Sequence, residues 1–240
     1  MCIRDSGFSY DGEKISPAKH PYYFAGLYYL QEPSAMTPAN RLPVEPGDRV
    51  LDVCAAPGGK TFTIAERMNN KGRVLAFDLH RNRARLIESG AKRLGLDCIK
   101  AGVNNAKVYD EKMPKADKVL CDAPCSGLGV IRRKPEIKYK EPSDFDRLPE
   151  IQYDILKTSA EYVKVGGTLV YSTCTFAPEE DEGQVAAFLQ RHPEFTLADV
   201  FGNVDYSFGS PGEANRTGGL PLDVNKVRRI WPCQGGEGHF

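Results

Sequence analysis

The stretch from Val50 to Thr61, V-L-D-V-C-A-A-P-G-G-K-T, constrains the fold more than any other part of the chain. Its apolar start, Val50 to Val53, is typical of a buried strand, and Pro57-Gly58-Gly59 then allows a tight turn and a close approach of the backbone to a ligand. Behind the glycines, residues recur at the spacing of one helix face: Thr61, Ile64, Ala65 and Met68. A strand, a glycine-rich turn and a helix N-terminus in this order form a cradle for a polar ligand.

The cradle does not match a phosphate-binding loop, although Gly59-Lys60-Thr61 copies the end of the G-x-x-x-x-G-K-[ST] pattern. Position 54 holds Cys54 where that pattern needs glycine, and the pattern G-x-G-x-x-G is also absent. A second apolar run, from Arg73 to Phe77, ends in Asp78. This residue follows Gly58 at roughly the 20-residue spacing at which an acid binds ribose hydroxyls. The spacing predicts an adenosine-containing cofactor, and capping of the next helix is the alternative role of Asp78.

Strands and helices continue to alternate after Asp78. The expected elements are a helix that ends near Gly95, strands at 98–103 and 118–121, a helix near 148–163, a strand at 168–171, and a helix that starts at Pro178 with Glu179, Glu180 and Asp181. This order predicts an α/β fold with an open, mostly parallel sheet and helices on both faces. Because ligands bind at the carboxyl ends of the strands in such sheets, the residues that follow each strand are expected to meet at one edge.

Two cysteines and a carboxylate follow the later strands. Asp122 and Cys125 come after the strand at 118–121, and Cys174 comes after the strand at 168–171. A thiolate at either position would be a strong nucleophile if Lys60, another cation or a helix N-terminus lowered its pKa, and the residues alone leave open which cysteine attacks. The alternatives are a buried apolar thiol, which is expected for Cys121, and a metal site. No metal is expected, because no second Cys or His pair lies at ligand spacing.

Composition limits the classes of partner and the compartment. The 32 basic residues are balanced by 32 acidic ones, so nucleic acid binding would depend on a local patch. One basic run follows Asp122 to Gly127 and consists of Arg132, Arg133, Lys134, Lys138 and Lys140, with Tyr139 among them. Such a run can neutralise phosphates or can simply be solvated. Seven scattered cysteines, no apolar run long enough to span a membrane and no signal peptide predict a soluble, cytoplasmic protein.

Three motifs give the chain a resemblance to a known family. The segments C-A-A-P-G-G-K at 54–60, D-A-P-C-S-G at 122–127 and G-G-T-L-V-Y-S-T-C-T at 166–175 resemble the RsmB/Nop/Sun family. These proteins are S-adenosylmethionine-dependent RNA methyltransferases that make 5-methylcytosine. The similarity runs from about Gln31 to Gln190 and implies a Rossmann-like class I methyltransferase fold.

The resemblance also implies roles for individual residues. S-adenosylmethionine would lie against Asp122 and the loop Cys54, Ala55, Ala56, Pro57, Gly58, Gly59 and Lys60. Its ribose would lie on Asp78, and its adenine near Asn104, where many relatives carry Asp, or near Asn105. The nucleophile matches Cys174, which would add to carbon 6 of a flipped-out cytosine. Asp122 would hydrogen-bond nitrogen 3 of the ring, and Cys125 would assist release of the product. Lys60 is also expected in the catalytic set, as the cation that could lower the pKa of the attacking thiol.

The chain is expected to have three parts, of which the first two are inferred from their residues and the third from the resemblance. Residues 1–6 are expected to be a scar or a disordered end, and 7–46 an N-terminal segment whose aromatic and basic residues could stack bases or pack onto the domain. Residues 47–240 would be the methyltransferase domain, with 202–221 as a long loop. Relatives continue through a last strand, so the domain is expected to be truncated.

The resemblance to bacterial members of the family implies small-subunit ribosomal RNA as the expected substrate. The alternatives are transfer RNA, a nucleotide triphosphatase that uses Gly59-Lys60-Thr61, and a non-catalytic RNA-binding module.

Overall fold

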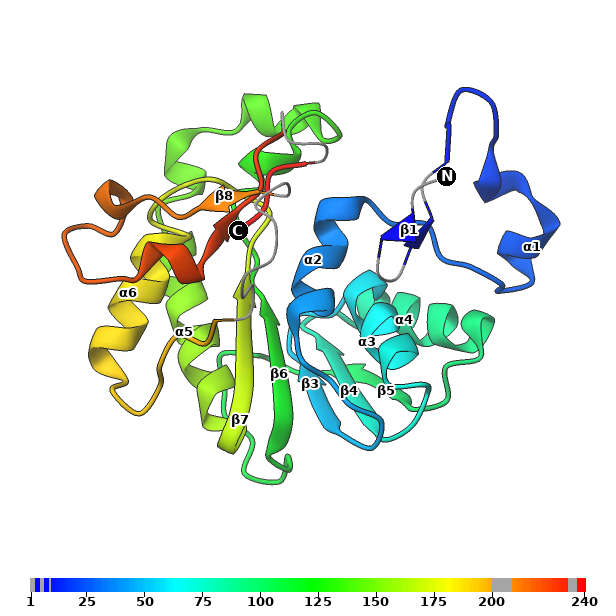
Figure 1. The fold of residues 1–240 in the computed structure, drawn as a ribbon, viewed down its shortest axis with the longest axis horizontal. Helices are drawn as coiled ribbons and strands as arrows, with labels where there is room; N and C mark the ends of the chain where they lie inside the picture. Colours follow the sequence, from blue (N-terminus) through cyan, green and yellow to red (C-terminus); the bar gives the residue numbers. More distant parts are fainter. Residues whose placement is uncertain (1–2, 5–6, 9, 200–208, 233–236) are drawn as a thin grey trace.

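A five-stranded parallel sheet forms the centre of the protein (Figure 1). The structure is a computed structural model and describes residues 3–4, 7–8, 10–199, 209–232 and 237–240. The strands are β3 (Arg49–Asp52), β4 (Arg73–Asp78), β5 (Ile99–Val103), β6 (Ala116–Asp122) and β7 (Val163–Ser172). They lie in the order β5-β4-β3-β6-β7, and every neighbouring pair is parallel. From β3 the chain adds β4 and β5 on one side, and it then returns to add β6 and β7 on the other side of β3. At such a topological switch point the carboxyl ends of the strands border a crevice that can bind a ligand.

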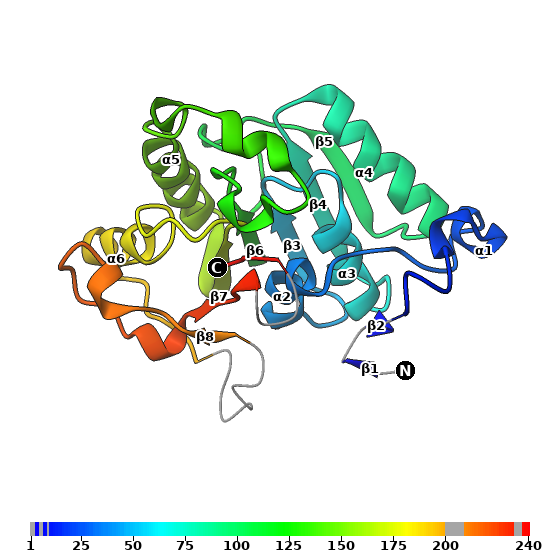
Figure 2. The same ribbon diagram turned by 90° about the horizontal axis from the view of Figure 1, so that it is seen from above.

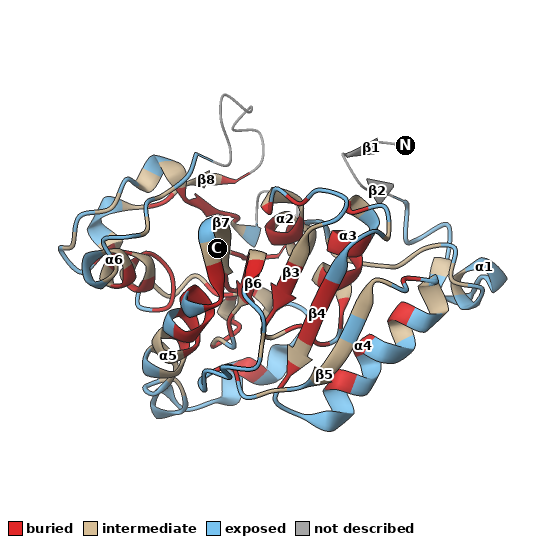
Figure 3. Ribbon diagram, turned by 90° about the horizontal axis from the view of Figure 1, so that it is seen from below, coloured by how far each residue is buried: buried red, intermediate tan, exposed pale blue. Residues whose placement is uncertain are grey.

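Helices cover both faces of the sheet, as the sequence predicts. Helices α2 (Pro33–Arg41), α3 (Gly59–Arg67) and α4 (Arg81–Leu94) lie on one face, and α5 (Leu148–Glu161) and α6 (Glu182–Arg191) lie on the other (Figure 1). Neighbouring strand residues divide between the two cores because strand side chains alternate in direction. Val50 packs in the core that contains Phe62, whereas Leu51 packs in the core that contains Leu156. Figure 3 shows the buried residues concentrated in the strands and on the helix faces that contact them.

The helix predicted to start at Pro178 starts later. Residues 178–181 form a turn, and α6 begins only at Glu182. The prediction treated the acidic residues as first-turn side chains that face the helix N-terminus. In the structure Glu180, Asp181 and Glu182 are all buried and bind partners in the interior. The predicted start is therefore wrong, because tertiary contacts use the side chains that would have capped the helix.

The N-terminal segment contains β1 (Ile3–Arg4), β2 (Gly7–Phe8), η1 (Pro17–Lys19) and α1 (Pro21–Phe24) before α2. Figure 2 shows α1 beside the end of α4. There the Arg93 guanidinium donates to the carbonyl of Tyr28 and lies 4.4 Å from the ring centre of Tyr23. Farther along, Ala39 and Leu42 are fully buried in the same core as Phe62. The end of α2 and the residues up to Val44 thus contribute to the core of the domain, and the boundary at 46/47 stays a prediction.

Short elements connect the main strands and helices. They are η2 (Leu128–Val130), η3 (Pro135–Tyr139) and η4 (Pro142–Asp144) after β6, and β8 (Ser210–Pro211), η5 (Ala214–Arg216), η6 (Val224–Lys226) and β9 (Arg228–Arg229) after α6. The predicted long loop at 202–221 therefore contains β8 and η5, while 202–208 lie outside the described residues.

At the end of the chain, His239 forms an antiparallel bridge with Ile230, and Phe240 exchanges two backbone hydrogen bonds with Thr173.

Candidate active site

The ends of β6 and β7 bring two predicted cysteines into contact. Cys125 lies in the loop after β6, Cys174 lies just beyond β7, and their sulfur atoms are 3.2 Å apart. The backbone N–H of Cys174 also donates to Cys125 Sγ at 3.3 Å. The residues are 49 positions apart in the chain. They meet because parallel strands β6 and β7 are neighbours and end at the same edge of the sheet.

The two thiols have different acidities. The hydrogen bond with the Cys125 thiol lowers the pKa of Cys174, and the nearby charges of Lys60 and Lys134 lower it further against burial and the charge of Asp122. The same hydrogen bond, together with burial, raises the pKa of Cys125 well above its ordinary value. Because the thiolate is the reactive form, this arrangement favours Cys174 as the nucleophile. Residue type and spacing alone leave open which cysteine attacks, whereas the family resemblance implies Cys174.

A buried ion pair lies beside the thiols. Lys60 Nζ, at the start of α3, donates to Asp122 Oδ2 at 2.8 Å, and the hydroxyl of Ser172 donates to Asp122 Oδ1 at 2.7 Å. Burial lowers the pKa of Lys60, but the charge and the hydrogen bond of Asp122 outweigh it, so the net pKa is raised. Lys60 therefore stays a cation close to Cys174. Ser172 is a site residue that the sequence reading missed, although its position two residues before Cys174 in the third motif is a signal for it.

The predicted cradle has the expected shape. Gly58 has φ of +115°, and a Cβ atom on it would lie 2.4 Å from the ring of Phe62, so both the backbone and the packing require glycine. The N–H groups of the first turn of α3 follow directly, and no side chain caps them. The backbone of Ala55 is fixed by a 2.8 Å hydrogen bond to the carbonyl of Phe77 in β4. The loop at 54–60 thus presents backbone donors at the carboxyl edge of the sheet.

Asp52 is a second site residue that the sequence reading missed. It ends β3, is fully buried, and its Oδ2 accepts a 2.7 Å hydrogen bond from the hydroxyl of Thr61. Within the described part of the chain its Oδ1 has no hydrogen-bond partner. Burial raises the pKa of Asp52 to about 7, and Asp122 adds to the shift against the opposing effects of Thr61 and Lys60. A polar residue that interrupts the apolar run V-L-D-V was the available signal.

The residues predicted to hold ribose and adenine lie on the neighbouring strands. Asp78 ends β4, is 5% exposed, accepts a hydrogen bond from the N–H of His80 and pairs with Arg83 at 3.2 Å. The backbone N–H of Asn104 donates to the carbonyl of Asp78, and Asn104 is half-buried. Asn105 is exposed, and its side chain accepts from the N–H of Lys107 instead. Of the two amides, Asn104 is therefore the one held beside Asp78.

A cavity of about 240 Å³ lies between the cradle and the ion pair. The predicted residues that line it are Cys54, Ala55, Ala56, Pro57, Gly59, Lys60 and Asp122. Asp78, Asn104, Cys125 and Cys174 are not among the described lining residues. The N-terminal segment closes the cavity with Tyr29, Leu30, Gln31, Glu32 and Ala35, and Arg133 reaches it from the basic run. The sequence analysis does not assign the segment around Gln31 to the site. No local sequence pattern indicates that this segment will pack over the loop at 54–60.

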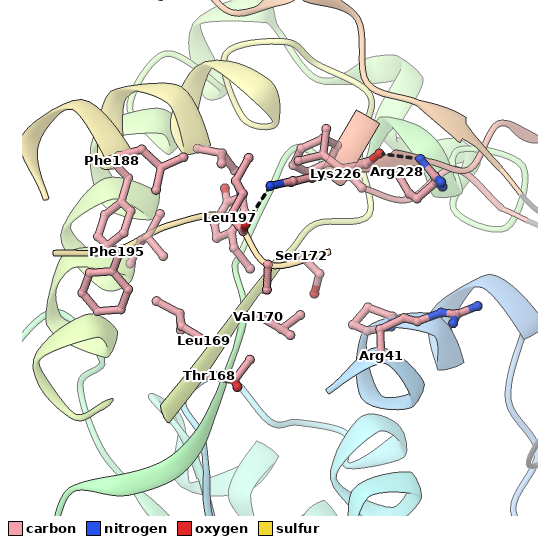
Figure 4. Close-up of a pocket in the computed structure, with 18 of the residues that line it drawn as sticks. Arg41, Thr168, Leu169, Val170, Ser172, Phe188, Phe195, Leu197, Lys226 and Arg228 are labelled. Carbon is pink, nitrogen blue, oxygen red and sulfur yellow. Dashed lines mark hydrogen bonds between the residues drawn. The ribbon is translucent and has the colours of Figure 1, made fainter. Parts of the chain in front are cut away.

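A larger cavity of about 340 Å³ lies elsewhere, between α2, the free side of β7 and α6 (Figure 4). Leu169, Phe188 and Phe195 give it an apolar wall, and the Lys226 ammonium donates to the carbonyl of Leu197 at its rim. None of the described residues that line it is a cysteine, an aspartate or a glutamate. The smaller cavity, which borders Lys60 and Asp122, is thus the candidate active site.

The sequence of the chain matches a known family of enzymes. A profile of the family described as 16S rRNA methyltransferase RsmB/F matches residues 39–240. The chain belongs to this family. The probable ribosomal RNA small subunit methyltransferase B of Bacillus subtilis strain 168 is 48% identical over 177 residues, which are 72% of this chain and 40% of that protein. The enzyme of the same name from Yersinia pseudotuberculosis is 38% identical over 188 residues, which are 75% of this chain and 42% of that protein. The chain therefore spans about two fifths of the length of these curated relatives.

Two solved structures from Pyrococcus horikoshii are similar in fold to this chain. NSun6 from Pyrococcus horikoshii, crystallised with SFG, has a TM-score of 0.81 and 32% identity over 94% of this chain and 55% of that one. A methyltransferase homologue from Pyrococcus horikoshii has a TM-score of 0.77 and 32% identity over 94% of this chain and 70% of that one. The Rossmann-like methyltransferase fold expected from the three motifs is confirmed.

The family match gives no support to the triphosphatase alternative. Lys60, which would have to reach a phosphate group, is held by Asp122. Among the described residues, no group of three or more His, Cys, Asp or Glu side chains is arranged to hold a metal ion. None of the described helices is long and apolar enough to cross a membrane.

Proposed function

We propose that the chain transfers a methyl group from S-adenosylmethionine to carbon 5 of a cytosine in RNA, through a covalent bond between Cys174 and the base. The observation that carries this proposal is the 3.2 Å contact between the sulfur atoms of Cys174 and Cys125, beside the Lys60–Asp122 pair. A methyltransferase that acts on a more nucleophilic atom has no need for a thiol pair at this edge. Family membership supports ribosomal RNA as the substrate.

The described residues fit S-adenosylmethionine. Asp52 lines the cavity beside the cradle, and its carboxylate, whose Oδ1 has no hydrogen-bond partner among the described residues, suits the ammonium group of the cofactor. Asp78 suits the ribose hydroxyls, as the spacing from Gly58 predicts. The structural relative NSun6 was crystallised with SFG, an analogue of S-adenosylmethionine. When bound, S-adenosylmethionine supplies the methyl group as the electrophile of a sulfonium ion.

The residues of the chain would activate the cytosine in two ways. The Cys174 thiolate forms a bond to carbon 6, and the electrons of the carbon 5–carbon 6 double bond move into the ring. Nitrogen 3 gains negative charge in this step, and the Lys60–Asp122 pair carries the protons that can stabilise it. The addition makes carbon 5 electron-rich, which prepares it for methylation.

Release reverses the addition. The proton on carbon 5 passes to a water molecule, its bonding electrons restore the carbon 5–carbon 6 double bond, and the carbon 6–sulfur bond breaks to return the Cys174 thiolate. Cys125 is the residue placed to assist this step, because its sulfur touches the sulfur that must leave. The hydrogen bond from Cys125 stabilises the Cys174 thiolate and so makes it a better leaving group.

The basic run after η2 is the proposed RNA contact. Arg132, Arg133, Lys134 and Lys138 are exposed, and Tyr139 beside them is 86% exposed. Arg132 and Arg133 each have a side-chain nitrogen 3.9 Å from the buried carboxylate of Glu237, and Arg133 also lines the cavity. Positive charge next to a cavity suits the phosphates on either side of a flipped base. A cytoplasmic location follows from the proposed substrate and stays a prediction.

The test is methyl transfer from labelled S-adenosylmethionine to bacterial small-subunit ribosomal RNA, with transfer RNA as a second substrate. Cys174→Ala is expected to give no product, because no covalent bond can form. Cys125→Ala is expected to accumulate a protein–RNA adduct that survives denaturation. Methylation by both variants at the rate of the unmodified protein would contradict the two-cysteine chemistry, and product on transfer RNA alone would change the substrate.

A further inference from the structure

The turn before α6 holds the loop that carries Cys125. Glu180 is 3% exposed, and its Oε2 accepts hydrogen bonds from the backbone N–H of Ser126 at 2.9 Å and from Gln152 Nε2 at 2.7 Å. Gln152, fully buried in α5, also donates to the carbonyl of Pro124 at 2.9 Å. The two peptide groups that flank Cys125 are therefore both fixed by this glutamine–glutamate pair.

The same turn also reaches the segment that carries Cys174. Ser126 Oγ and Thr175 Oγ1 are 2.7 Å apart, which links the residues that follow the two cysteines. The hydroxyl of Thr173 donates to Asp181 Oδ1 at 2.6 Å, and Asp181 pairs with the buried Arg229 at 3.2 Å. Glu180 and Asp181 are consecutive in the sequence, and each binds one of the two segments. Glu180 binds the loop that carries Cys125, and Asp181 binds the segment that carries Cys174.

We propose that Glu180, oriented by Gln152, is a positioning residue that keeps Cys125 against Cys174, and thereby sets the step in which the product is released. This role rests on the chemistry proposed above. It follows from position: among the described residues, no hydrogen bond joins the Glu180 carboxylate to either sulfur, and Glu180 does not line the cavity at the cradle. Without an acceptor for its N–H, the Ser126 peptide would be a buried unpaired donor, and the loop would move to pair it.

Two substitutions separate the hydrogen-bond role from simple filling of space. Glu180→Gln keeps an oxygen that can accept from both Ser126 and Gln152, whereas Glu180→Met fills a similar volume and accepts from neither. Glu179→Met is the matched control, because Glu179 is the exposed neighbour of Glu180. If Glu180→Met does not fold, Gln152→Met replaces it, since it removes the donor that orients Glu180.

The first readout uses the protein without RNA or cofactor. Diamide takes two electrons and two protons from a pair of thiols and leaves a disulfide, so the rate at which Cys125 and Cys174 become linked reports how often their sulfurs meet. The linked peptides are quantified by mass spectrometry. Glu180→Met is expected to slow the linkage by about tenfold or more, because an unpaired buried donor disfavours the native loop by that order. Glu180→Gln and Glu179→Met are expected to match the unmodified protein.

The second readout is the ratio of covalent protein–RNA adduct to methylated RNA. Glu180→Met is expected to raise this ratio toward that of Cys125→Ala, whereas partial unfolding would lower adduct and product together. The proposal would be overturned if the Glu180→Met variant formed the Cys125–Cys174 disulfide as fast as the unmodified protein. It would also be overturned if Glu180→Gln slowed disulfide formation as much as Glu180→Met does. If the unmodified protein links its thiols but methylates no RNA, the proposed function fails and the positioning role stands on the first readout.

Discussion

Replacement of Asp52 by asparagine should remove a large pH dependence of stability. In the unfolded chain this carboxyl ionises near its ordinary pKa of 3.8, whereas burial raises its pKa to about 7 in the folded protein. Well below pH 4 both states carry the proton, and the stability contribution of Asp52 is fully present. As the pH rises toward 7, the unfolded chain loses a proton that the folded protein keeps, so the contribution is lost at about 1.4 kcal/mol per pH unit. Between pH 5 and pH 8 this amounts to about 3 kcal/mol.

The measurement is urea unfolding of the unmodified protein and of the Asp52→Asn variant at several values between pH 5 and pH 8. The amide of the variant can still accept the hydrogen bond from Thr61 but cannot ionise, so the variant should gain about 3 kcal/mol of unfolding free energy relative to the unmodified protein across this range. Asp97→Asn is the control, because Asp97 is exposed and its replacement should give no such trend. If Asp52→Asn changes the unfolding free energy equally at pH 5 and pH 8, the folded carboxyl is already ionised at pH 5 and the burial argument is wrong.

Two further predictions concern buried and exposed arginines. Arg229 is 1% exposed and pairs with Asp181 and Glu182, so Arg229→Met should lower the unfolding free energy by about 3–5 kcal/mol by leaving buried carboxylates unpaired. A loss below about 1 kcal/mol in urea unfolding, the value typical of exposed pairs, would contradict this. Arg133→Ala should weaken RNA binding and reduce the slope of log affinity against log salt by about one, because one phosphate contact is lost. Arg85→Ala on α4 is the control and should leave the salt slope unchanged. If Arg133→Ala gives the same slope as this control, Arg133 does not contact a phosphate.

Local patterns were sufficient to predict most of the sheet and the cradle. The apolar run at Val50, the glycines at 58 and 59 and the helical spacing behind them act within a few residues, so the strand and the helix at this point could be read directly. The carboxyl-end rule then placed Asp78 and Cys174 at one edge without knowledge of any contact. The same local reasoning was wrong at Pro178, because distant partners draw Glu180 inward.

The sequence by itself thus determined the alternation of strands and helices, the edge at which the polar residues gather and, through its three motifs, the family. Only the tertiary structure decided which of those residues touch. The 3.2 Å contact of Cys125 with Cys174 and the ion pair of Lys60 with Asp122 each join segments separated by about fifty positions or more. The acidity of Asp52 depends on exclusion of water by packing from several elements. Periodicity reports the face on which a residue lies, whereas distances and burial arise from the whole fold, and the chemistry depends on those distances.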